Sequence, residues 1–242
     1  MSKNILVTGV SQGLGLEIAR AILDAGWTVY GVSRQHSAGY QELQQANGER
    51  AKFHAVDLAD ASSLRERIFG AFVPFQVPLH GLVNNAAMAY EDLVSNLEMN
   101  RLRAMYEVNV FAPMAITKLV IRNMLLHRVA GSLVHISSIS VHTGYKGLAM
   151  YASTKGALEA FSKNTAREWG GRGIRSNCVV AGFMETAMSG GLTPDQKEKI
   201  FQRTALKRAT APASVAAAVC YLLGDGAASV TGQNIVVDAG TI

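Results

Sequence analysis

The sequence predicts a single α/β domain: a doubly wound parallel sheet of about seven strands with helices on both faces. Two observations predict it. Short apolar runs of β type alternate with helical patterns along the chain, which is typical of strand–helix units and a parallel sheet. A glycine-rich turn joins the first expected strand to the first expected helix. Because no repeat or linker divides the 242 residues, we expect one domain over 1–242.

The expected strands are short apolar or β-branched runs, as in sheets that are covered on both faces. They are Asn4–Thr8, Thr28–Val32, Ala51–Val56, Gly81–Val83, Gly131–Ile136, Ile174–Val180 and Asn234–Val237. Helical spacing predicts a helix over Gly15–Ala25, a charged helix around Ser62–Phe72, and two long helices on either side of the fifth strand. Ligands of such sheets bind at the carboxyl ends of the strands, so functional residues are expected directly after each strand.

Composition and charge exclude several classes of protein. The net charge of +5 is spread along the chain without a run of basic residues, which disfavours a nucleic-acid partner and favours acidic or phosphorylated ligands. No apolar run approaches the roughly 20 residues that span a bilayer, and the N-terminus lacks the pattern of a signal peptide. We therefore expect a cytoplasmic protein without a membrane partner. Cys178 and Cys220 lack metal-ligand spacing, so no metal is expected.

The first strand runs into TGVSQGLG (8–15), and a helix follows. Glycines at this point let the backbone turn tightly and approach a pyrophosphate at the positive end of the helix. A glycine-rich turn without a ligand is the alternative. The spacing TGxxxGxG also differs from the GxGxxG of most dinucleotide-binding domains.

Residues after the next three strands predict which nucleotide is bound. Ser33 and Arg34 follow the second strand, where an acidic residue would bind the ribose 2′-hydroxyl of NAD. Arg34 instead favours the 2′-phosphate of NADP(H), unless it is one more solvated loop cation. Asp57, beside Leu58, is placed to accept a hydrogen bond from the adenine amino group, or is a simple turn aspartate. NNAA (84–87) would lie against the cofactor, although adjacent asparagines are also common in turns.

Catalytic side chains are expected around YASTK (151–155). Ser138 ends the fifth strand, Tyr151 follows thirteen residues later, and Lys155 lies four residues further on. Residues four apart share a helix face. A cation about 4 Å away at an effective dielectric of about 20 offers roughly 4 kcal/mol, which would lower the tyrosine pKa by up to roughly 3 units. This would suit a general acid/base, whereas YxxxK by itself is more often an exposed helix with no such role.

Together these motifs resemble those of the short-chain dehydrogenase/reductase family over nearly the whole chain. The segments that carry the resemblance are TGVSQGLG (8–15), DL (57–58), NNAA (84–87), Asn109 in EVNV, HISS with Ser138, YASTK (151–155), SNCVVAGFMET (176–186) and VTGQNIVVDAG (230–240). Within the family the chain is most similar to bacterial 3-oxoacyl-[acyl-carrier-protein] reductases. The resemblance implies a Rossmann-type fold, NADP(H) as cofactor, a carbonyl substrate such as a 3-oxoacyl thioester, and a homotetramer.

The resemblance also implies a role for individual residues. Ser138 would polarise the substrate carbonyl, and Tyr151 would donate the proton on reduction. Lys155 would hold the nicotinamide ribose and lower the tyrosine pKa, and Asn109 would support a water on the proton relay. The implied cofactor-binding positions are Gly9, Ser11, Gln12, Gly13, Leu14, Gly15, Ser33, Arg34, Asp57, Leu58, Asn84, Ala86, Tyr151, Lys155, Gly182, Phe183, Met184 and Thr186.

A substrate lid is expected at about 186–204. Thr193 and Gln196 bracket Pro194 in the pattern of a helix start with a capping box. The substrate contacts that we expect, each of which is as consistent with ordinary packing, are Ser138, His142, Tyr145 and Met188. Arg128 and Arg172 are candidates to attract an acidic acyl carrier protein; the alternative is that both are solvated surface cations.

Three functions remain open at this level. The leading one is an NADPH-dependent ketone reductase with Tyr151 as general acid. The second is an NAD(P)-dependent alcohol or polyol dehydrogenase that works in the oxidative direction. The third is a module that senses NADP without turnover, a protein expected to lose the Tyr or the Lys that this chain keeps.

Overall fold

In the computed structural model, which describes residues 2–185 and 193–242, seven parallel strands form one sheet. The strands are β1 (Asn4–Thr8), β2 (Thr28–Ser33), β3 (Ala51–Ala55), β4 (Gly81–Asn84), β5 (Ser132–Ser138), β6 (Arg175–Ala181) and β7 (Asn234–Val237). Their order is β3-β2-β1-β4-β5-β6-β7, and all pair in parallel. The fold class expected from the sequence is therefore confirmed. The order reverses between β1 and β4, where a doubly wound sheet forms its ligand crevice.

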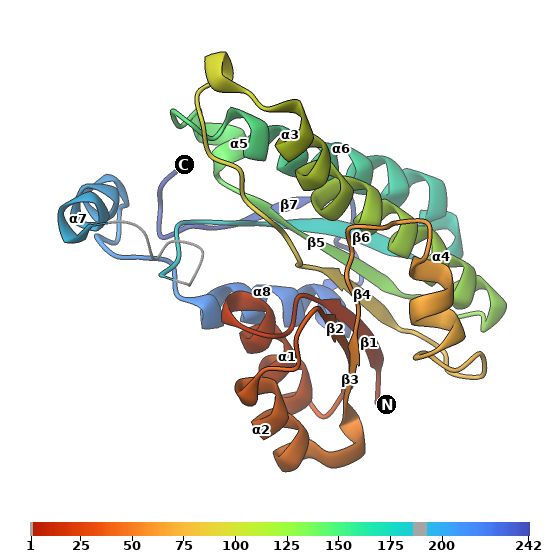
Figure 1. Cartoon of the computed structure of the whole chain (residues 1–242). Coiled ribbons are helices and arrows are strands. Elements are labelled where there is room, and N and C mark those ends of the chain that lie inside the picture. Colours follow the sequence, from red (N-terminus) through yellow and green to blue (C-terminus); the bar gives the residue numbers. More distant parts are fainter. Residues whose placement is uncertain (1, 186–192) are drawn as a thin grey trace.

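Helices cover both faces of the sheet (Figure 1). They are α1 (Gly13–Asp24), α2 (Ala38–Asn47), α3 (Met99–Tyr106), α4 (Ala112–Leu126), α5 (Ser140–Thr143), α6 (Ala149–Trp169), α7 (Pro194–Arg203) and α8 (Pro212–Leu223). Figure 1 shows α1, α2 and α8 on one face and α3, α4 and α6 on the other. The short elements are 3-10 turns at Gly48–Arg50, Val94–Asn96, Gly170–Arg172 and Asp225–Ala227, and π-helical turns at Arg65–Gly70 and Glu107–Phe111.

The two faces carry separate cores because successive strand residues point to opposite sides of the sheet. Ile5 and Val7 of β1 pack in the core under α1 and α8. Leu6, between them, packs in the core under α4. Burial on both faces explains why the strands are almost continuously apolar.

Three helices differ from expectation. Helix α1 begins at Gly13, two residues early, and the charged helix expected around Ser62–Phe72 is only a π-helical turn. Helix α2 was not expected. Its start had a signal in the sequence, since the Ser37 hydroxyl caps it by accepting a hydrogen bond from the backbone N–H of Tyr40.

One helical stretch passes a length and composition test for a membrane span. Met99–Leu126, which runs through α3 and α4, has a mean hydropathy of 1.3 in its most apolar window, and 50% of that window is buried. Charged residues interrupt it, so the sequence shows no unbroken apolar run there. Because a core helix passes the same test and this stretch packs on α6 and the sheet, it is weak evidence for a membrane segment.

Candidate active site

The turn after β1, called here the nucleotide loop (residues 9–15), is built from main chain. Gly9 and Gly13 have φ of +76° and +55°, in the region that favours glycine. A Cβ on Gly15 would lie 2.0 Å from the Gly9 carbonyl oxygen. No acidic side chain lies in the first turn of α1, whose first N–H groups have no partner within the helix. This is a cradle for an anion.

The segment after β4 closes over the nucleotide loop. The Asn85 side-chain amide donates to the carbonyl oxygens of Thr8 at 3.0 Å and Gly9 at 3.2 Å. In return, the Thr8 hydroxyl accepts from the backbone N–H groups of Asn85 and Ala86, each at 3.0 Å. Sequence reasoning assigned Asn84 and Ala86 to the cofactor and gave Asn85 no separate role, yet Asn85 is the side chain that fixes the loop.

Asn84 instead points into the interior. It is 2% exposed, and its amide nitrogen donates to Thr117 Oγ1 at 3.1 Å and lies 3.1 Å from His135 Nδ1. Its side-chain amide nitrogen therefore belongs to the contact between β4, α4 and β5.

The ends of β2 and β3 lie beside each other at the rim of the crevice. Arg34 is exposed, and among the described residues no hydrogen bond or ion pair holds its guanidinium. The Ser33 hydroxyl donates to the Gln35 carbonyl oxygen at 2.8 Å. Asp57 is exposed and accepts from the Ala59 N–H at 3.0 Å, as a turn aspartate does, while Leu58 is buried. Within the described part of the chain, Arg34 is thus a cation at this rim without a hydrogen-bond or ion-pair partner.

The four residues expected to be catalytic lie in β5, α6 and the π-helical turn at 107–111. Ser138 ends β5 and is half-buried; its hydroxyl accepts from the Ser140 N–H at 3.2 Å. Lys155 is 2% exposed, and its ammonium donates to the Ile136 carbonyl oxygen at 2.9 Å. It lies 5.7 Å from the centroid of the Tyr151 ring. This hydrogen bond connects α6, which carries Tyr151, to β5, which ends in Ser138.

The pKa of Tyr151 moves in the direction opposite to the one expected. Burial raises the pKa of Tyr151 to about 12, and the Glu91 carboxylate also raises it. Burial lowers the pKa of Lys155 to about 8, with a smaller opposing effect from Cys178. The prediction that Lys155 lowers the Tyr151 pKa is wrong for the chain without a bound cofactor. The expected lowering assumed that the Lys155 ammonium lies about 4 Å from the phenol oxygen, and it did not include the cost of burying a phenolate.

Asn109 lies in the π-helical turn between α3 and α4 and is fully buried. Its carbonyl oxygen accepts from the Met88 N–H at 2.9 Å, and its amide donates to the Met88 carbonyl oxygen at 2.9 Å and to Thr154 Oγ1 at 3.1 Å. Thr154 precedes Lys155 on α6. Asn109 thus joins the segment after β4 to the helix that carries the tyrosine, and π-helical turns are frequent at functional sites.

The segment after β6 approaches the end of β7. A Cβ on Gly182 would lie 2.5 Å from the Asp238 Cα, and the Gly182 N–H donates to the Val237 carbonyl oxygen at 2.9 Å. Phe183 is half-buried with its ring 6.2 Å from that of Phe201 in α7, and Met184 packs against the core. Two predicted site residues, Thr186 and Met188, lie outside the described residues, as does the lid from 186 to 192.

Helix α7 starts as the sequence predicts. The Thr193 hydroxyl accepts from the Gln196 N–H, and the Gln196 side chain accepts from the Thr193 N–H, which completes the capping box. None of its residues is buried.

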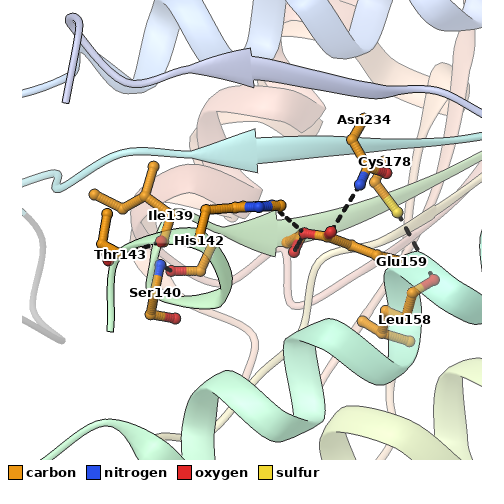
Figure 2. A network of polar contacts seen from close by, with 10 residues as sticks. Ile139, Ser140, His142, Thr143, Leu158, Glu159, Cys178 and Asn234 are labelled. Atoms are coloured by element: carbon orange, nitrogen blue, oxygen red, sulfur yellow. Dashed lines mark hydrogen bonds and ion pairs between the residues drawn. The ribbon is translucent and has the colours of Figure 1, made fainter. Parts of the chain in front are cut away.

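Two predicted substrate residues lie beside the site. Tyr145, half-buried, follows α5. His142 points its ring at Glu159, a residue that sequence reasoning missed; its Nε2 lies 3.2 Å from Glu159 Oε1 (Figure 2). Its side chain is 35% exposed, so one part of the ring is buried against α6 and the rest faces outward.

Arg128 and Arg172, the candidates for a carrier protein, lie at the opposite end of the sheet. Both are exposed and precede the amino ends of β5 and β6, and a Cβ on Gly173 would lie 2.9 Å from the Ala130 Cβ. From that edge, seven strand residues lead to Ser138, or about 23 Å at 3.3 Å per residue. The two arginines are therefore remote from Tyr151 of the same chain.

Comparisons with known proteins agree with this geometry. A family model described as Enoyl-(Acyl carrier protein) reductase matches residues 9–241. L-xylulose reductase of Caenorhabditis elegans is 33% identical over 98% of this chain and 95% of its own. The 3-oxoacyl-[acyl-carrier-protein] reductase FabG of Escherichia coli (strain K12) is 33% identical over 98% of this chain and 96% of its own.

Solved structures show the same architecture. A variant of actinorhodin polyketide ketoreductase with NADPH is 28% identical, with a TM-score of 0.91 over 99% of this chain and 97% of that chain. The fold is also shared by 4-hydroxyisoleucine dehydrogenase complexed with NADH, which is 22% identical with a TM-score of 0.92 over 99% of this chain and 98% of that chain. With the family model matched almost from end to end, the chain belongs to the short-chain dehydrogenase/reductase family, whose members are oxidoreductases that use nicotinamide cofactors.

Proposed function

We propose that this oxidoreductase uses NADPH to reduce a ketone to a secondary alcohol, with Tyr151 as the general acid. One observation carries the proposal. The half-buried phenol of Tyr151 lies one helical turn from the buried Lys155, and the lysine is hydrogen-bonded to the strand that ends in Ser138. A proton donor is what the reductive direction requires.

NADP(H) fits the residues of the crevice. The nucleotide loop leaves no room for a Cβ at Gly15 and presents the start of α1, which suits a pyrophosphate. Arg34 is free at the rim, where no acidic side chain follows β2, which suits a 2′-phosphate. The NADPH bound to the polyketide ketoreductase, 28% identical to this chain, supports the same assignment. When bound, the nicotinamide supplies the hydride.

The chain's own residues handle the proton. Ser138 donates a hydrogen bond to the substrate carbonyl and polarises it. Tyr151 gives its proton to the carbonyl oxygen as the alcohol forms. The proton that Tyr151 gives up is replaced from solvent along a relay that includes the Lys155 ammonium, whose pKa of about 8 lies near the operating pH.

Asn109 has a supporting role in this proposal. Its side chain is fully used by Met88 and Thr154, so it holds the π-helical turn against α6. A water on the proton relay would then be bound by the main chain of that turn. The family resemblance implies that Asn109 supports this water. In the proposal the support comes from the backbone of the turn and not from the Asn109 side chain.

The substrate proposed is a 3-oxoacyl thioester or a related ketone, on the strength of the 33% identity to a 3-oxoacyl-[acyl-carrier-protein] reductase. An acyl carrier protein is its proposed partner. Because Arg128 and Arg172 are remote from Tyr151 of the same chain, an acidic carrier bound to them would serve the site of another subunit. That arrangement needs the homotetramer, which stays a prediction, as does the cytoplasmic location.

The alternative is an alcohol or polyol dehydrogenase that works in the oxidative direction. The 33% identity to L-xylulose reductase supports a sugar such as L-xylulose, and the polyol formed from it, as the substrate pair. Oxidation uses Tyr151 as the base in place of the acid, with the same residues around it. The reductive direction is preferred because the relatives at 33% identity and the ketoreductase at 28% are all named as reductases.

The test is a screen of carbonyl substrates monitored at the NADPH absorbance. The panel contains acetoacetyl thioesters, aryl ketones and L-xylulose, with NADH and the matching alcohols in parallel. Turnover of a thioester or ketone with NADPH is expected. Tight NADPH binding without turnover on any carbonyl would contradict the proposal and favour an NADP-sensing module, and turnover confined to polyols with NADP⁺ would favour the alternative.

A further inference from the structure

Helix α6 carries a further polar residue, Glu159, in line with the half-buried Tyr151 and the buried Lys155. Glu159 follows Lys155 by four residues and Tyr151 by eight, so the three lie on one face of the helix. We call them the acid–base stripe. Glu159 is 9% exposed and, unlike Lys155, has no place in the reaction described above.

The Glu159 carboxylate accepts hydrogen bonds from three different elements. Oε1 accepts from Ser137 Oγ of β5 at 2.5 Å and lies 3.2 Å from His142 Nε2 of α5. Oε2 accepts from Asn234 Nδ2 of β7 at 2.7 Å. Figure 2 shows Glu159 between His142 and Asn234. Because a buried carboxylate is costly unless it is hydrogen-bonded, these donors are needed to keep it in place.

Two of the three donors enclose Ser138. Ser137 directly precedes it and His142 follows it by four residues, and we call residues 137–143 the serine segment. Inside this segment, Ser138 Oγ accepts from the Ser140 N–H and Thr143 Oγ1 donates to the Ile139 carbonyl oxygen at 2.9 Å. The segment is a strand end and one turn of helix. Its strand part pairs with β6, where the Ile139 N–H also donates to the Ala181 carbonyl oxygen at 3.1 Å, and Glu159 adds a contact from α6 at each end of the segment.

We propose that Glu159 is a positioning residue, which clamps the serine segment against α6 and so fixes Ser138 relative to Tyr151. A misplacement of about 1 Å in a catalytic group is enough to cost about 100-fold in rate. The inference rests on the proposed function for its effect on turnover, but the clamp itself is a property of the chain alone.

The first measurement is therefore independent of activity. Hydrogen exchange of the serine segment is compared among the wild type, Glu159→Gln and Glu168→Gln, a control at an exposed position of the same helix. Glutamine keeps the shape but loses one acceptor oxygen. We expect exchange in the serine segment of Glu159→Gln to be faster by roughly tenfold, and unchanged in the control. Unchanged exchange in Glu159→Gln overturns the inference, whether or not the protein is active.

The second measurement asks whether Glu159 acts through Ser138. Glu159→Gln is expected to lower kcat by about 10- to 100-fold while the Kd for NADPH changes by less than about twofold. In a Ser138→Ala background the same change is expected to alter kcat by less than about twofold, because the group being positioned is gone. An equal loss of kcat in both backgrounds overturns the inference.

Two smaller changes keep the proposal testable where Glu159→Gln does not fold. Ser137→Ala removes one arm of the clamp and His142→Gln replaces the other, and each leaves the carboxylate two donors. Each is expected to lower kcat by about threefold to tenfold, with no further loss in the Ser138→Ala background. Wild-type kcat in both overturns the inference. A wild type that turns over no carbonyl, with faster exchange in these variants, refutes the proposed function and leaves the clamp intact.

Discussion

The nucleotide loop and the acid–base stripe lie on the side of the molecule where the strands have their carboxyl ends, but they are built from different groups. The loop is main chain: glycines at positions where a Cβ would collide, held by the Asn85 amide. The stripe is buried side chains, with the Lys155 ammonium on a carbonyl oxygen and the Glu159 carboxylate among three donors. The loop is therefore sensitive to added volume, and the stripe to changes of charge and hydrogen bonding.

The largest effect is expected in the stripe. Tyr151→Phe removes one oxygen and the transferable proton, and general acid catalysis contributes about 10²- to 10⁴-fold. We expect kcat to fall by about 10³-fold while the Kd for NADPH, measured by fluorescence titration, stays within about threefold. Wild-type turnover in this variant would remove Tyr151 from the mechanism.

In the loop, the matching experiment adds a single methyl group. The Cβ of Gly15→Ala would lie 2.0 Å from the Gly9 carbonyl oxygen and 2.4 Å from Asn85 Nδ2. Overpacking of this kind costs about 3 kcal/mol or more in the free energy of unfolding, which urea titration measures. NADPH binding is expected to weaken with it. Gly171→Ala is the volume control, because nothing lies within 4 Å of the Cβ site there and its φ is outside the left-handed region. If Gly15→Ala is no less stable than this control, the close approach has no energetic weight.

A third experiment asks whether the interior behind the stripe makes the fold sensitive to acid. Burial lowers the pKa of His135 to about 4, and Lys155 adds to the effect. Between about pH 6.5 and pH 4 the unfolded chain takes up a proton that the folded chain refuses, so the free energy of unfolding falls as pH falls. At 1.36 kcal/mol per unit this contribution is about 3 kcal/mol, and it is complete below pH 4.

Urea unfolding at pH 7 and pH 4.5 measures this loss. His135→Gln is expected to lose less stability between the two pH values than the wild type, even though it starts less stable at pH 7. His36→Gln, at an exposed histidine, is the control. An equal loss in His135→Gln and the wild type would show that other groups set the acid sensitivity.

The smallest effect is expected at the rim of the crevice, where a free side chain adds to the main-chain site. Arg34→Ala is expected to weaken NADPH binding about tenfold, since a hydrogen bond to a charged group contributes about 1.5–3 kcal/mol. NADH affinity is expected to change by less than about twofold, because NADH has no 2′-phosphate. Equal losses for both nucleotides would mean that Arg34 supports the loop and does not select the cofactor.

The sequence was informative where a pattern is local. β1 and β7 begin and end at the residues expected, and the Thr193 capping box is present. Each depends on neighbours along the chain, such as an apolar run or a cap three residues from its partner. The parallel, doubly wound sheet follows from the same alternation of strands and helices, whereas the order of its strands was not predicted.

What the sequence did not predict depends on contacts between distant residues. Asn84 and Asn85 are adjacent asparagines that the sequence does not distinguish. The Asn84 side chain faces the core, and the Asn85 side chain faces the nucleotide loop. The π-helical turn around Asn109 leaves no mark in composition. Glu159 had a signal, a third polar residue at four-residue spacing on α6, but its donors come from β5, α5 and β7. The prediction of a lowered Tyr151 pKa was wrong because a four-residue spacing does not show how deeply the phenol is buried.

The contact between Asn85 and the nucleotide loop also constrains the order of folding. The loop is encoded within the first fifteen residues, yet the side chain that closes it arrives about seventy residues later, with β4. At a synthesis rate of about 5–20 residues per second, the growing chain carries an open loop for several seconds. The nucleotide loop is thus synthesised before the side chain that closes it, and α1 has no finished anion site until β4 pairs with β1.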